Sequence, residues 1–197
     1  MTTSIPLMGV FVAAALLSVW EFLRRGERPE SYLADREAHG AHVVMNGAMA
    51  AMVAPGYDGT VERAVFWVLL LGAMTLILRL ALAVQAGTRE KAIASGYHAV
   101  AMFAMVYAVV LMPAAAMHHA GGMHHAMPTP WIASVFGILF LLDGVATVVA
   151  AVFFPARMLG AAGVEMGSGA RKALIGDLRR SAIPHVVMDA GMAWMLL

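Results

Sequence analysis

Six apolar segments separated by short polar loops account for most of this sequence of 197 residues. Apolar residues make up 61% of the chain and charged residues 13%, whereas about a quarter of the residues of a soluble domain are charged. Because an apolar helix of about 20 residues spans a bilayer, the sequence predicts a single all-α transmembrane domain over residues 1–197. The expected spans are 5–23, 40–53, 61–84, 94–112, 131–154 and 184–197.

The Lys and Arg residues that lie outside the expected spans occur only in alternate loops. The segments that follow the first, third and fifth spans hold 11 of the 13 Lys and Arg residues, and the intervening loops hold none. Since cytoplasmic loops are enriched in Lys and Arg, we expect both chain termini outside and the basic loops in the cytoplasm. The sequence thus predicts a multi-pass protein of the bacterial inner membrane, with the lipid bilayer as its surroundings.

A His/Met pattern occurs twice, near residue 42 and again near residue 185. In both copies Met follows the His at offsets 3, 7 and 10. With 17 Met in the chain, three Met at preset offsets from a given His should arise by chance with a probability of roughly 0.0006. These offsets share one face of an α-helix, so each copy predicts a stripe of imidazole and thioether groups. The two stripes comprise His42, Met45, Met49, Met52, His185, Met188, Met192 and Met195.

The fourth span carries a related stripe, in which His98 is followed on one face by Met102, Met105 and Met112. The second, fourth and sixth spans should run in the same direction, and each opens with its His. We therefore expect three helical hairpins related by a pseudo-three-fold axis, with a site at the repeat interface. The three imidazoles should converge at one depth, and thioethers of the three stripes should follow one helical turn further out. These thioethers would come from Met45, Met188 and either Met102 or Met105.

The ligand types available in the chain favour a soft metal. The chain has no Cys, which excludes disulfides, thiolate metal sites, iron–sulfur clusters and cysteine nucleophiles. Thioethers favour Cu(I), and imidazole also binds copper, although any single Met is more simply explained as flexible core filling. We expect Cu(I) to be moved across the membrane or delivered to a copper-accepting or copper-donating protein, without an enzymatic step. The net charge of +1 gives no reason to expect a nucleic-acid partner.

Two alternatives use the same residues. A haem ligated by His42, His98 or His185 and an opposing His or Met would make the protein an electron carrier. A copper-dependent membrane oxidase is the second alternative, although the sequence indicates no substrate cavity.

Polar residues beside the stripes are candidates for supporting roles. Asn46 and Asp189 occupy the same position in the two long stripes and could either orient a ligating imidazole or link helices. Asp143 lies near the middle of the fifth span, so we expect it to face the interior and to pair with His, Asn or water. His39, one turn before His42, could be a feeder ligand, although a solvated loop residue is the simpler expectation.

The loop at 114–130 is unusually rich in His and Met. It contains four His and three Met within 11 residues, a composition typical of metal capture. Its alternative explanation is a polar linker of no particular function. The candidate ligands are Met117, His118, His119, Met123, His124, His125 and Met127.

The six-span organisation and the His-x-x-Met-x-x-x-Met segments resemble an uncharacterised actinobacterial membrane family that carries only a domain-of-unknown-function label. This resemblance covers most of the chain and implies no activity. The Met-x-x-x-Met steps, Met45/Met49 and Met188/Met192, are also similar to those of the eukaryotic high-affinity copper transporters. That likeness is an analogy of ligand pattern, because those proteins assemble three chains of three spans each.

Overall fold

The computed structural model describes residues 4–24, 36–111, 131–153 and 168–197. These residues form six α-helices and, within these ranges, no β-strand, which confirms the all-α class. The helices are α1 (Ser4–Arg24), α2 (Arg36–Met52), α3 (Gly59–Gln85), α4 (Arg89–Leu111), α6 (Trp131–Phe153) and α8 (Ser168–Leu196).

Four of these helices, α1, α3, α4 and α6, are long and apolar enough to cross a membrane. The expectation of six such helices is therefore only partly confirmed. Of the other two, α2 has 17 residues, and α8 contains several charged residues in its first half. Both helices carry the polar residues of the His/Met stripes, and this lowers their mean hydropathy.

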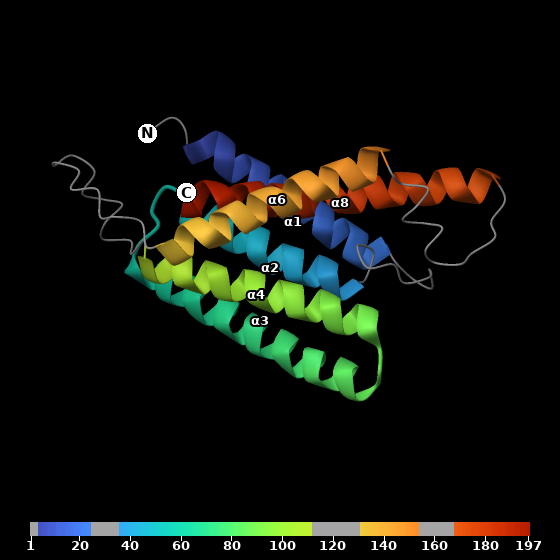
Figure 1. The fold of residues 1–197 in the computed structure, drawn as a ribbon. Helices are drawn as coiled ribbons and strands as arrows, with labels where there is room; N and C mark the ends of the chain where they lie inside the picture. Colours follow the sequence, from blue (N-terminus) through green and yellow to red (C-terminus); the bar gives the residue numbers. More distant parts are fainter. Residues whose placement is uncertain (1–3, 25–35, 112–130, 154–167) are drawn as a thin grey trace.

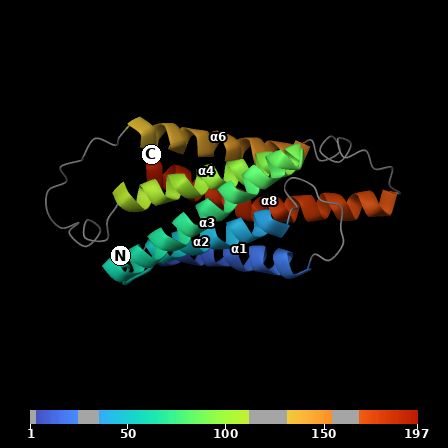
Figure 2. The same ribbon diagram turned by 90° about the horizontal axis from the view of Figure 1, so that it is seen from below.

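The last helix differs most from the expectation. The sequence suggested a span opening at Pro184, but α8 begins at Ser168 and continues through Pro184 without a break. The side-chain amide of Asn46 links α2 to this part of α8, because it donates a hydrogen bond to the Pro184 carbonyl at 3.3 Å. The first part of α8 extends beyond the other helices (Figures 1 and 2).

The helices pack as three hairpins, α1 with α2, α3 with α4, and α6 with α8. The second members of these pairs, α2, α4 and α8, also contact one another, and we call them the inner helices. Each outer helix in addition contacts the inner helix of one neighbouring hairpin: α1 contacts α8, α3 contacts α2, and α6 contacts α4. The three inner helices run in the same direction (Figure 1). We call the end at which they begin the basic end, because its loops hold most of the Lys and Arg.

Local signals explain how the second hairpin begins and turns. Asp58 caps α3, because its carboxylate accepts hydrogen bonds from the amides of Thr60 at 2.8 Å and Val61 at 2.9 Å. The turn between α3 and α4 contains Gly87 with φ of 68°, a left-handed conformation that suits glycine. This short turn places α4 antiparallel to α3 and brings His98 into the bundle.

This packing gives the bundle an apolar outer surface and a core of small and flexible side chains. The outer helices expose large aliphatic and aromatic side chains, such as Leu16, Leu71 and Leu142, as expected of helices that face lipid. The core between the inner helices consists largely of Met and Ala, with Phe11 and Leu69 contributed by outer helices. The small Ala and Gly side chains let the helices approach closely, and the flexible Met side chains fill the remaining space.

Candidate metal centre

Three buried imidazoles meet where the inner helices come together. The Nε2 atom of His42 lies 3.1 Å from Nδ1 of His185 and 3.3 Å from Nε2 of His98. One nitrogen from each ring lies within 4.8 Å of the others, and all three side chains are buried. The convergence of these three residues, predicted from their positions on parallel helices, is therefore confirmed.

Hydrogen bonds on the far sides of two rings determine which nitrogens face the centre. His98 Nδ1 lies 2.8 Å from the Ala94 carbonyl, and His185 Nε2 lies 2.9 Å from Asp143 Oδ2. Both partners are acceptors, so in the neutral rings these two nitrogens carry the protons. His98 Nε2 and His185 Nδ1 then present lone pairs to His42 Nε2. His42 Nε2 carries either one proton or a lone pair of its own. The three facing nitrogens therefore have at least two lone pairs and at most one proton among them.

A pair of carboxylates and a tyrosine support His185 from the other side. Tyr97 lies within hydrogen-bonding distance of Asp143 Oδ2, at 2.8 Å, and of Asp189 Oδ1, at 3.0 Å. Asp189 Oδ2 is also 3.4 Å from His185 Nε2. A Cβ at Gly144 would stand 3.2 Å from the Cβ of Asp189, so glycine at this position allows the close approach of α6 and α8. Asp143 approaches the centre from α6, as expected, although 38% of its side chain remains exposed.

The two residues that share one position in the stripes have different partners. Asp189 contacts His185 and Tyr97, which fits the role of orienting an imidazole. Asn46 instead donates to the backbone carbonyls of His42, at 3.0 Å, and Pro184, at 3.3 Å. Asn46 therefore links α2 to α8, and within the described residues it has no hydrogen bond to a ligating imidazole.

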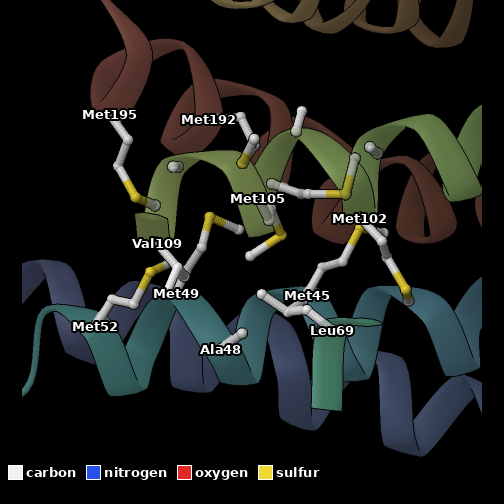
Figure 3. Close-up of a cluster of buried hydrophobic side chains, with 14 of the residues drawn as sticks. Met45, Ala48, Met49, Met52, Leu69, Met102, Met105, Val109, Met192 and Met195 are labelled. Carbon is white, nitrogen blue, oxygen red and sulfur yellow. The ribbon is translucent and has the colours of Figure 1, made fainter. Parts of the chain in front are cut away.

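All eight stripe methionines within the described residues are buried. Figure 3 shows Met49, Met105 and Met192 extending into the space between the inner helices. The sulfur of Met102 instead lies against Gly72 of α3, where an added Cβ would be 2.6 Å from it. Of the two α4 methionines, Met105 is therefore the candidate ligand next to the imidazoles. The eight residues are Met45, Met49, Met52, Met102, Met105, Met188, Met192 and Met195.

Two findings were not expected from the sequence. Tyr97 was missed, although its place beside His98 in a span marked it as a polar residue near the site. His39 is fully buried in α2, with its ring centroid 6.2 Å from that of His42, so it is not the solvated loop residue that we expected. Met112 and the loop ligands from Met117 to Met127 lie outside the described residues.

The fold and the centre together define a class: an all-helical protein with four helices long and apolar enough to cross a membrane and a histidine–aspartate cluster where the three inner helices meet α6. Residues 34–197 match the family model described as a domain of unknown function, DUF5134, and the chain belongs to this family. This agrees with the resemblance to an uncharacterised family. No curated protein and no solved structure matches the chain. The geometry of the histidine–aspartate cluster is therefore the basis for proposing what the protein does.

Proposed function

We propose that the protein binds a copper ion between α2, α4 and α8 and either moves it across the membrane or passes it to another copper protein. The observation that carries this proposal is the set of facing nitrogens of His42, His98 and His185, which hold more lone pairs than protons. When His42 Nε2 carries no proton, a metal cation can bind the lone pairs of all three nitrogens at once. It also explains why imidazoles are buried against one another in a bundle that is otherwise apolar.

The spacing of His42 Nε2 from its two neighbours suits ligation of one ion. At metal–imidazole bonds of about 2.0–2.1 Å, nitrogens 3.1 and 3.3 Å apart subtend about 100° at the ion, close to the tetrahedral angle. The nitrogens of His98 and His185 lie within 4.8 Å of each other, and both can bind the same ion once they are about 4 Å apart or less. The hydrogen bond from His185 to Asp143 is the carboxylate–histidine pairing that holds metal-binding imidazoles in position. Both features support a three-histidine site whose fourth position is open to a further ligand.

The thioethers above the imidazoles favour copper over zinc. Imidazole binds both metals, whereas thioether sulfur selects Cu(I). Met45, Met49, Met188 and Met192 are fully buried on α2 and α8, one to two turns beyond the imidazoles. Ligands of this kind at successive depths are suited to an ion that moves along the bundle.

The haem alternative fits this spacing poorly. Axial haem ligands lie on opposite sides of the iron, so their nitrogens should be about 4 Å apart at ordinary metal–imidazole bond lengths. The nitrogens of His42 and His185 are 3.1 Å apart, and their ring centroids are 5.2 Å apart. This leaves no room for a porphyrin between them.

The proposal includes the membrane arrangement expected from the sequence. In it all six helices cross the bacterial inner membrane, with both termini outside and the basic end in the cytoplasm. The short and polar helices α2 and α8 are acceptable as spans because other helices surround their polar faces. The cyclic contacts of the three hairpins support a pseudo-three-fold axis.

Replacing Asp143 with asparagine should weaken copper binding by about 10–100-fold, the usual effect of removing a carboxylate that orients a ligating histidine. The reason is the 2.9 Å contact with His185 Nε2, which a neutral amide replaces poorly. Competition with a calibrated chelator measures this change. Asp58→Asn is the matched control, because asparagine also caps a helix and Asp58 is exposed at the start of α3. Equal affinities of D143N and the wild type would contradict the role of Asp143.

Replacing the thioethers of Met45, Met49, Met188 and Met192 with leucine should abolish the preference for Cu(I). Leucine nearly conserves the side-chain volume, so the fold should persist at a cost below about 1.5 kcal/mol per site. The variant should still bind Zn(II) through the imidazoles. The ratio of Cu(I) to Zn(II) affinity, measured by chelator competition, should fall at least tenfold.

The exposed Met74 of α3 provides the control for this variant, because Met74→Leu removes a thioether far from the core. It should leave the affinity ratio unchanged. An unchanged ratio in the fourfold variant would show that the methionines act only as core filling.

A further inference from the structure

A second group of buried polar side chains lies between the imidazoles and the basic end of the bundle. Glu21 of α1 and His39 of α2 are both buried, and so are Ser18 of α1 and Ser181 of α8. Ionisable residues inside a membrane bundle are costly, and they mark ion or substrate pathways. None of these four residues belongs to the three-histidine centre.

Contacts between the helices place Glu21 and His39 at one level. A Cβ at Gly40 would be 3.8 Å from the ring of Phe22, so the residues next to His39 and Glu21 are adjacent in space. Arg180 of α8 approaches the same level, with its Nε 3.6 Å from Glu21 Oε1. His42 lies one helical turn beyond His39, with 6.2 Å between the ring centroids. The buried carboxylate of Glu21 and the buried imidazole of His39 thus lie on the side of the centre that faces the basic end.

We infer that Glu21 and His39 form a second cation site, through which a copper ion passes between the three-histidine centre and the basic end. This inference rests on the proposed function. Arg180, whose side chain is 49% exposed, lies beside Glu21 towards the surface and neutralises its carboxylate when no cation is bound. A cation at Glu21 would compete with this ion pair, so the site would exchange with the surface whenever Arg180 moves away.

The order of ligands along the bundle fits a site of release. Thioether and imidazole both suit Cu(I), whereas carboxylate is a harder ligand that Cu(I) does not favour. An ion that passes from the methionines and the three imidazoles to Glu21 and His39 therefore loses ligands that it favours. Conduction requires sites weak enough to let the ion leave, and the Glu21–His39 pair is the weakest of the three.

The test uses the purified full-length protein in detergent and in vesicles that contain a trapped Cu(I) chelator. In detergent, copper titration of the wild type should show one strongly bound ion and a second, weaker ion. Glu21→Gln and His39→Asn should each remove the weaker ion and retain the strong one. In vesicles, each variant should carry Cu(I) at least tenfold more slowly than the wild type.

Glu90→Gln is the matched control, because Glu90 is an exposed carboxylate in the first turn of α4 at the same end of the bundle. It should retain both ions and the wild-type rate. The inference is overturned if the wild type binds a single ion, if both variants keep the weaker ion, or if their rates equal that of the wild type. Failure of the proposed function gives a different result: the strong ion is then absent from the wild type or is unaffected by His98→Ala.

Discussion

Replacing His185 with alanine should leave the purified protein without its strongly bound copper. His185 supplies one of the three facing nitrogens and also connects the centre to Asp143 and Asp189. Removal of the His185 ring leaves only two imidazoles at the centre, and it leaves Asp143 and Asp189 without their imidazole partner. Metal analysis of Cu(I)-loaded protein from which weakly bound copper has been removed by a chelator should give one ion per chain for the wild type and a background level for the variant.

Free imidazole provides an internal control for this prediction. It should enter the space left by the missing ring and restore copper binding to the His185→Ala protein, which shows that the bundle has kept its fold. Size-exclusion elution identical to that of the wild type would support the same point. Retention of a full copper ion by His185→Ala without imidazole would contradict the assignment of this residue as a ligand.

Introducing leucine at Gly191 should destabilise the bundle by about 1–3 kcal/mol or more, the usual cost of overpacking a dense core. A Cβ at this position would already stand 2.6 Å from Phe11 Cε1 and 2.8 Å from the sulfur of Met49. Both side chains are buried, so neither has free space into which to move. The temperature at which the detergent-purified protein loses its monodisperse elution peak should fall clearly below that of the wild type.

The control for this substitution is Gly47→Leu on α2. Gly47 is exposed, and no atom lies within 4 Å of the position where its Cβ would be. Leucine there should be neutral or slightly stabilising, because it favours helix more than glycine does. Equal thermal stability of the Gly191 and Gly47 variants would show that α8 does not pack against α1 and α2 as closely as described.

The sequence predicted the three imidazoles because their positions depend on helix geometry alone. The places of His42, His98 and His185 near the beginning of three parallel spans indicated a common depth, and helical periodicity indicated the face that each shares with its methionines. Asp143 was predictable for a related reason, since a carboxylate in mid-span must find a polar partner in the interior. Neither argument required knowledge of how far apart the helices lie.

Features that depend on contacts between helices could not be predicted in this way. Asn46 and Asp189 share one stripe position, yet one bonds to backbone carbonyls and the other lies beside His185 and Tyr97. The sulfur of Met102 lies against α3 because Gly72 leaves space there, and helical periodicity does not show this. The continuity of α8 through Pro184 was likewise not predicted, because the local sequence favoured a helix start there.

X-ray absorption at the copper edge of the Cu(I)-loaded wild-type protein tests the central claim most directly. A first shell dominated by imidazole nitrogen at about 2.0 Å, with the outer-ring scattering of histidine, is the result that the three-histidine centre predicts. That signal should disappear from the His185→Ala protein. A shell made only of sulfur at about 2.3 Å, unchanged by the substitution, would contradict the account, because the ion would then be held by methionines alone.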